Sequence, residues 1–228
     1  MGILSENRMF LYMVFFLAFL HLTFDPRMTV AYLLIIVCDY WWYKDDSYVS
    51  LPMERTEATR KSAIASTVIY YAVFLFASIV ILGMTTVGKE FASVSGVFQL
   101  SATAVPILQG SKIFTFISWG FIIPIIETRF FFGRLYEGMA VHAKDFLGYE
   151  ISTKKLTIAT IGLIIFISAL FTIFHIGAKG LSTPALMTTF IFAVISLLFV
   201  TKTQELKGAS MLHILTNSIG VLKNIGVF

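Results

Sequence analysis

Long runs without a single aspartate, glutamate, lysine or arginine recur throughout this sequence. Four of them reach the length of about 20 mostly apolar residues that a helix needs to cross a bilayer. These four cover residues 62–88, 91–111, 156–178 and 180–201, and four shorter runs cover residues 9–24, 28–38, 113–126 and 208–222. The pattern predicts an all-α fold, a polytopic bundle of transmembrane helices.

The composition excludes a soluble globular domain. Charged residues make up 13% of the chain and hydrophobic residues 57%, whereas soluble domains carry about 25% charge. Because the apolar runs leave no room for a separate soluble part, we expect residues 1–228 to form one integral membrane domain. The 17 lysines and arginines are scattered through loops, not gathered in a stripe, so the expected partner is the lipid bilayer and not nucleic acid.

The lysines and arginines predict the number of spans and the orientation. Of the 17 basic residues, Arg129 lies within a span. If residues 91–111 do not cross, there are seven spans, and the other 16 divide 11 to 5 between the two sides; if they cross, there are eight spans, and the division is 8 to 8. Cytoplasmic loops carry an excess of positive charge. The uneven division therefore favours seven spans, with the N-terminus and the loops 44–61 and 134–155 in the cytoplasm.

Polar residues inside the apolar runs are the candidates for function. Ionisable groups at membrane depth are costly and usually face a cavity or one another, and the notable positions are Glu127, His175, His213 and Asn217. Glu127 could also be a structural carboxylate paired with a neighbouring arginine. His213 and Asn217, four residues apart, share one helix face. Two donors so placed suit either a developing oxyanion or a polar link between neighbouring helices.

Counting the rise per residue separates the two histidines in depth. If the helices are straight and upright, His175 lies about 30 Å from the cytoplasmic face and His213 about 9 Å from it. Glu127 would then lie beside only one of them. Tilted or bent helices, or water inside the protein, are needed to bring the three together.

The order of these polar residues resembles that of a known family. Glu127, then Phe171-x-x-x-His175, then His213-x-x-x-Asn217, all on late membrane helices, is similar to the motifs of the CAAX protease and bacteriocin-processing (CPBP, or Abi) family of intramembrane endopeptidases. The second and third family motifs, Phe-x-x-x-His and His-x-x-x-Asn, are intact. We therefore expect the catalytic-like part of the chain to lie within residues 124–217.

The first family motif, Glu-Glu-x-x-x-Arg, is only partly present. Its leading glutamate matches Glu127, but Thr128 stands at the second glutamate and Phe132 at the arginine. In the family these two lost residues are thought to hold the site together. A site that keeps Glu127 without them must be supported in another way.

The resemblance also implies a chemistry. It makes Glu127 the general base on the attacking water, His175 its partner, and His213 with Asn217 the oxyanion donors. It implies a metal-independent peptidase without a cofactor, acting on a membrane-associated protein or peptide at the cell membrane of a prokaryote. Glutamate with two histidines could instead bind zinc, although the chain has no His-Glu-x-x-His spacing.

Two other functions fit the same residues. A CPBP relative without catalytic activity could act as a scaffold, an immunity protein or an accessory subunit of a membrane complex. A transporter could use Glu127 as a proton relay. The transporter reading leaves the pairing of His213 with Asn217 unexplained.

Overall fold

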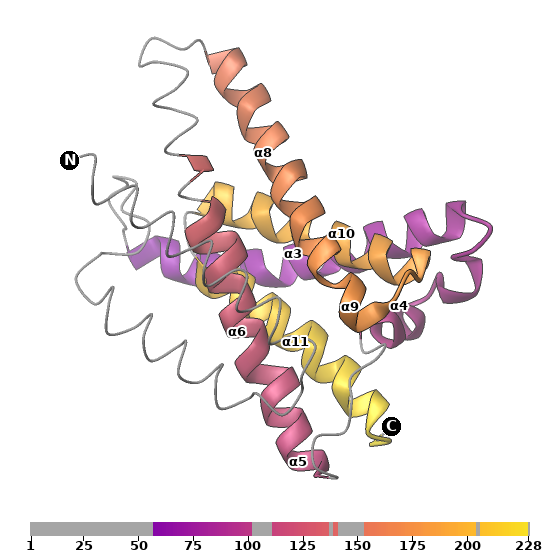
Figure 1. The fold of residues 1–228 in the computed structure, drawn as a ribbon. Coiled ribbons are helices and arrows are strands. Elements are labelled where there is room, and N and C mark those ends of the chain that lie inside the picture. The colour runs from indigo at the N-terminus through magenta and orange to yellow at the C-terminus, as the bar shows by residue number, and fades with distance from the viewer. Residues whose placement is uncertain (1–56, 102–110, 137–138, 141–152, 204–205, 228) are drawn as a thin grey trace.

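The computed structural model describes residues 57–101, 111–136, 139–140, 153–203 and 206–227 (Figure 1). Every regular element in these ranges is helical, which confirms the all-α prediction. The elements are α3 (Glu57–Met84), the short 3₁₀ helix η2 (Lys89–Phe91), α4 (Val94–Ser101), α5 (Lys112–Thr115), η4 (Phe116–Ile122), α6 (Ile123–Glu127), η5 (Thr128–Leu135), α8 (Thr153–Phe174), α9 (Ile176–Lys179), α10 (Thr183–Thr203) and α11 (Leu206–Asn224).

Four of the predicted spans are helices long and apolar enough to cross a membrane. They are Ala65–Met84, Lys112–Gly133, Thr157–Phe174 and Thr183–Thr203. The predicted spans at 9–24 and 28–38 lie outside the described residues. The last predicted span is helix α11, which is not among the four, so the described part of the chain supports four spans and not the full seven.

The doubtful run 91–111 begins with a short helix. Helix α4 has 8 residues, so at 1.5 Å per residue it covers about 12 Å, less than half of the apolar core of a bilayer. Residues 102–110 lie outside the described residues. The described part of this run therefore does not make a crossing helix by itself.

One helix of the bundle has an irregular backbone. Helices α5, η4, α6 and η5 follow one another without leaving the right-handed helical region, and we call this continuous segment, Lys112–Leu135, the Glu127 helix. Both η4 and η5 are π-helical; at the end of η4 the Ile123 N–H bonds the Ser118 carbonyl five residues earlier. Such π turns are rare and concentrate at functional sites. Here they flank Glu127 on both sides.

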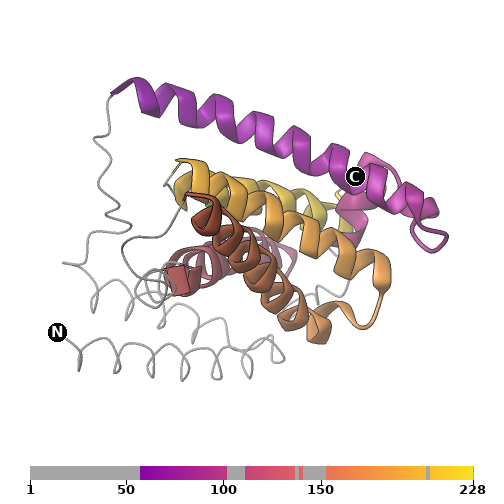
Figure 2. The same cartoon turned by 90° about the horizontal axis from the view of Figure 1, so that it is seen from above.

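Helix α10 is the centre of the packing. It contacts α3, α8 and α11. In its most apolar stretch 67% of the residues are buried, against 22% in α3 and 28% in α8. Figure 2 shows α3 along one edge and α10 beside it, with α8 crossing α10 obliquely. Apart from Thr157, the exposed residues described on α3 and α8 are apolar or glycine, as expected of faces that meet lipid.

Aromatic rings fill the space between α10, α8 and the Glu127 helix. Phe131 and Phe132 of the Glu127 helix and Phe171 of α8 are almost fully buried, and so is Phe192 of α10. The Phe171 ring lies 5.1 Å from both Phe131 and Phe132 and 6.2 Å from Phe192, measured between ring centroids. This cluster forms a dry wall beside Glu127.

Candidate active site

Glu127 is a buried carboxylate flanked by two imidazoles. Its side chain is only 3% exposed, and its Oε2 lies 3.6 Å from His175 Nε2 and 3.4 Å from His213 Nε2. The structure thus brings together three residues predicted as a site from separate apolar runs. In the described residues, Glu127 thus has two histidines as close neighbours.

The depth estimate from upright helices is wrong. It separated His175 from His213 by about 20 Å, yet both imidazoles lie within 4 Å of the same oxygen. The reason is the geometry of the bundle, because α8 crosses α10 obliquely and α11 runs along the Glu127 helix (Figures 1 and 2). Distance along a helix is then a poor measure of depth.

His175 is positioned by its own helix. It is the residue between α8 and α9, and its N–H bonds the Thr172 carbonyl three residues earlier, so the helix tightens and ends there. Its Nδ1 lies 2.7 Å from the Phe171 carbonyl oxygen. A carbonyl can only accept, so Nδ1 carries the hydrogen. The other nitrogen, Nε2, faces Glu127 Oε2 at 3.6 Å.

His213 is positioned by a different helix. It lies in the middle of α11, and its Nδ1 is 3.1 Å from the hydroxyl oxygen of Thr128 on the Glu127 helix. The ring of Phe192 packs 4.7 Å from the imidazole, and that of Phe171 5.9 Å from it. Both partners of this hydrogen bond are buried.

Asn217 lies one turn after His213 and contacts the backbone of the Glu127 helix. Pro124 has no N–H, which leaves the Gly120 carbonyl four residues earlier without its usual helical donor. Trp119 directly precedes Gly120. The Trp119 carbonyl accepts from Asn217 Nδ2 at 3.4 Å, and the Gly120 carbonyl accepts from the adjacent Ser218 hydroxyl at 3.1 Å.

Gly120 makes this close approach possible. A Cβ at this position would stand 3.1 Å from Ser218 Oγ, tighter than ordinary contact. The bond of Asn217 uses one of the two hydrogens of its amide, so the other is available to a ligand. Asn217 itself does not contact Glu127; it lies beside the pair on the same face of α11 as His213.

The two departures in the first motif have visible replacements. Thr128 is fully buried and bonds His213, and Phe132 is fully buried between the Phe171 and Phe192 rings, at 5.1 and 6.3 Å. The site is therefore supported by one hydroxyl and by aromatic packing. From the sequence alone, Thr128 was only a missing carboxylate, because its hydrogen-bond partner His213 is 85 residues away.

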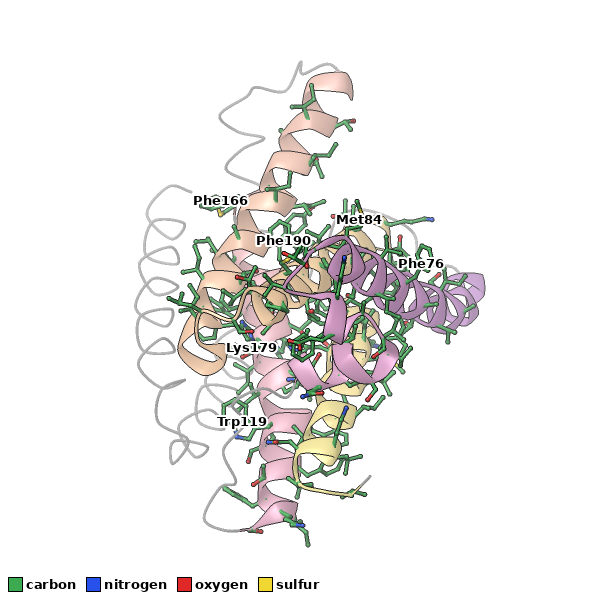
Figure 3. All side chains as sticks on the ribbon, turned by 90° about the vertical axis from the view of Figure 1, so that its right-hand side faces the viewer. Phe76, Met84, Trp119, Phe166, Lys179 and Phe190 are labelled. Atoms are coloured by element: carbon green, nitrogen blue, oxygen red, sulfur yellow. The ribbon has the colours of Figure 1, made fainter. Side chains whose placement is uncertain are left out.

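Lys179 is a charged neighbour that the sequence analysis did not identify. It is the last residue of helix α9, one turn after His175, and Figure 3 labels it. Its Nζ donates to the Thr189 hydroxyl at 2.8 Å. Burial lowers the pKa of Lys179 from 10.5 to about 8, while attraction to Glu127 acts in the opposite direction. The sequence gives no signal for this role, because Lys179 is a single charged residue between two apolar runs.

Among the described residues, no group of three or more histidines, cysteines, aspartates and glutamates has an arrangement that could hold a metal ion. Oxygen Oε2 of Glu127 accepts no hydrogen bond of ordinary geometry from the part of the chain that the structure describes. A buried acceptor in that condition is suited to receive a proton from a bound molecule. The arrangement can perform acid–base chemistry.

Comparison with known proteins identifies the family of this segment. Residues 109–219 match the family model described as type II CAAX prenyl endopeptidase Rce1-like. None of the curated proteins and none of the solved structures matches the chain. The match confirms the resemblance to the CPBP family over this segment, and together with the apolar helices it indicates an integral membrane protein.

Proposed function

We propose that this Rce1-like protein is an intramembrane endopeptidase that hydrolyses a peptide bond near the end of a membrane-associated protein or peptide. One observation carries the proposal: a buried glutamate whose free oxygen lies within 4 Å of two imidazoles. A polar group is costly at this depth unless it is used or satisfied. The family name adds the substrate class, a C-terminal CAAX sequence carrying a prenyl group.

Glu127 acts as the general base. A water bound beside Oε2 gives up a proton to the carboxylate while its oxygen attacks the scissile carbonyl carbon. His175 Nδ1 donates to the Phe171 carbonyl, so Nε2 is the nitrogen that can exchange a proton with Glu127. The proton taken from water stays on Glu127 or His175 until it passes to the leaving nitrogen. The C–N bond then breaks and leaves one carboxylate and one amine.

His213 and Asn217 act on the carbonyl oxygen. As the water oxygen attaches, that oxygen becomes an oxyanion, and donors held in place beside it lower the barrier. His213 Nε2 is next to Glu127, and the spare hydrogen of the Asn217 amide is one turn away on the same face. The aromatic wall around His213 excludes water, which strengthens both interactions.

The substrate approaches from the side of His175. This imidazole is 13% exposed, whereas Glu127 and His213 are 3% and 4% exposed. A peptide entering there meets the Glu127–His175 pair before it reaches His213. The deeper imidazole is then the one that meets the carbonyl oxygen.

A non-catalytic relative is the alternative from another class. It needs no free acceptor at Glu127, and it gives no reason for two histidines and an asparagine to gather at one carboxylate. A scaffold or accessory subunit would keep its role in the Glu127→Gln variant. The peptidase proposal is favoured because the polar groups are aimed at one another in a buried place.

The test is cleavage by the purified full-length protein in lipid vesicles. Peptides ending in a CAAX sequence, with and without a prenyl group, are compared, and products are identified by mass spectrometry, with Glu127→Gln as the control. Cleavage that disappears in the control supports the proposal. Absence of cleavage of every peptide, together with an intact biological role of Glu127→Gln, would overturn it.

We also propose that the N-terminus and the loops 44–61 and 134–155 are cytoplasmic, on the strength of the 11 to 5 division of basic residues. Single cysteines introduced in these loops, in a Cys38→Ser background, can be labelled with an impermeant reagent. Labelling only in inverted membranes fits this orientation. Labelling of both loops in intact cells contradicts it.

A further inference from the structure

The hydroxyl of Thr128 is used differently from those of seven other threonines in the described residues. Seven threonines donate their hydroxyl to the carbonyl four residues earlier in their own helix; they are Thr115, Thr172, Thr188, Thr189, Thr201, Thr203 and Thr216. The hydroxyl of Thr128 contacts His213 Nδ1 instead. Its hydrogen is therefore free to point at the imidazole.

The direction of this hydrogen bond decides which nitrogen of His213 carries the hydrogen. A neutral imidazole has one N–H and one acceptor nitrogen. If Thr128 donates to Nδ1, the hydrogen of His213 is on Nε2, and Nε2 is the nitrogen that faces Glu127 at 3.4 Å. If Nδ1 donates to Thr128, Nε2 has only a lone pair and faces the carboxylate with no hydrogen between them.

We propose that Thr128 is a positioning residue whose hydroxyl donates to His213 Nδ1 and holds the hydrogen on Nε2, where it can meet the oxyanion. This inference rests on the proposed function, since the oxyanion belongs to that reaction. It gives the two histidines opposite tautomers: Nδ1–H in His175, fixed by the Phe171 carbonyl, and Nε2–H in His213, fixed by Thr128. One imidazole shares protons with Glu127, and the other is a donor.

A hydroxyl is suited to this task in a way that a carboxylate is not. An ionised carboxylate can only accept, so a glutamate at position 128 would draw the hydrogen of His213 to Nδ1. Threonine both donates and leaves the imidazole neutral. Position 128 thus changes the state of His213 and does more than fill space.

The carbonyl of Pro124 competes for the same ring. It also lies within hydrogen-bonding reach of the His213 imidazole, and it accepts the backbone N–H of Thr128. An Nδ1–H tautomer directed at this carbonyl is therefore the alternative arrangement. Without the Thr128 hydroxyl, the carbonyl becomes the natural partner of Nδ1.

Nitrogen-15 magnetic resonance of the histidine side chains tests the tautomer directly. The chain has 4 histidines, so the full protein in lipid gives few signals, and His213 is assigned by its loss in His213→Gln. We expect an unprotonated Nδ1 and a protonated Nε2 for His213 in the wild type, and the opposite for His175. A protonated Nδ1 on neutral His213 in the wild type overturns the proposal, whatever any variant does.

Two substitutions at position 128 then separate the hydroxyl from the shape. Thr128→Val keeps the shape and removes the hydroxyl, and Thr128→Ser keeps the hydroxyl. We expect Thr128→Val to move the hydrogen of His213 to Nδ1 and to lower kcat roughly 10-fold to 100-fold at unchanged KM, as when the partner that orients a functional histidine is lost. Thr128→Ser should retain the tautomer and most of the activity.

Thr188→Val is the matched control. Thr188 is equally buried, but its hydroxyl bonds the Pro184 carbonyl in its own helix α10. This variant should leave the tautomers and kcat as in the wild type. If Thr128→Val behaves like Thr188→Val while the wild type cleaves its substrate, the role of Thr128 is refuted and the proposed function stands. If the wild type cleaves nothing, the function fails, and the spectrum still decides the tautomer.

Discussion

The two histidines beside Glu127 are held in contrasting ways. His175 is fixed within one turn of chain, because its Nδ1 bonds the carbonyl of Phe171 in the same helix. His213 is fixed by a hydroxyl 85 residues away in sequence, on the Glu127 helix. Both imidazoles nevertheless present Nε2 to the same oxygen, at 3.6 and 3.4 Å. Local and long-range contacts can thus build two halves of one site.

Because of this contrast, a single substitution can remove the partner of His213 but not that of His175. The partner of His175 is a main-chain atom, which every side-chain substitution at Phe171 retains. The partner of His213 is a side chain, so a single substitution at Thr128 removes it. The His213 half of the site is therefore the half that mutations can alter.

The largest expected effect comes from the residue that both histidines share. Glu127→Gln keeps the size of the side chain but cannot accept a proton, so it should lower kcat by about 10² to 10⁴. Substrate affinity, measured by equilibrium binding of a fluorescent prenylated peptide, should persist. If Glu127→Gln cleaved the substrate at the wild-type rate, Glu127 would not be the general base, and the two histidines would not be partners of a base.

The next effect concerns the His213 half alone. Asn217→Ala removes an oxyanion donor and should cost about 10² to 10³ in kcat. Ser218→Ala is its matched control, because Ser218 also donates to the backbone of the Glu127 helix but lies outside the proposed oxyanion site. Equal losses in the two variants would mean that Asn217 acts by tying the helices together and not as a donor to the substrate.

A substitution of Lys179, one turn after His175, should change the stability of the folded protein in a way that depends on pH. The folded-state pKa of Lys179, about 8, is below its ordinary value of 10.5, so the unfolded chain binds more protons between these pH values, and the wild type gains stability as pH rises from 8 to 10.5. Lys179→Met avoids burying the charge and should be about 1 to 2 kcal/mol more stable at pH 7. Denaturation from pH 7 to 10.5 should show this advantage shrinking; an advantage independent of pH would contradict it.

The smallest effect is expected at Phe171. Phe171→Leu keeps the carbonyl that bonds His175 and changes only the packing of a ring, so it should cost about 1 kcal/mol of stability. The nitrogen-15 spectrum should still show His175 with a protonated Nδ1. A change of tautomer in this variant would show that the ring, and not the carbonyl, holds His175.

The sequence predicts the local half of this molecule better than the long-range half. Apolar runs located the helices Ala65–Met84, Thr157–Phe174 and Thr183–Thr203, and polar residues within runs identified Glu127, His175 and His213. These signals lie within one or two turns of chain. They do not predict how the helices cross, so the assumption of upright helices led to wrong depths for His175 and His213.

Contacts across the bundle were beyond the reach of these patterns. Thr128 was recorded as a lost carboxylate, because nothing near it in sequence shows that His213 is its partner. The effect of Pro124 was missed as well: its absent N–H matters through Ser218 on α11, about 90 residues later, which donates to the Gly120 carbonyl. Such contacts depend on how helices cross, which apolar periodicity does not encode.

The polar links between α11 and the Glu127 helix bear on how the protein moves. His213 contacts Thr128, Asn217 contacts Trp119, and Ser218 contacts Gly120, three directional bonds along one seam. Helix α8 meets the Glu127 helix through the ring of Phe171 against Phe131 and Phe132, contacts that tolerate small displacements. We therefore expect α11 and the Glu127 helix to behave as one rigid body. If the proposed substrate, a lipidated chain, enters the site, α8 should be the element that swings, and the Glu127–His175 distance should report the opening.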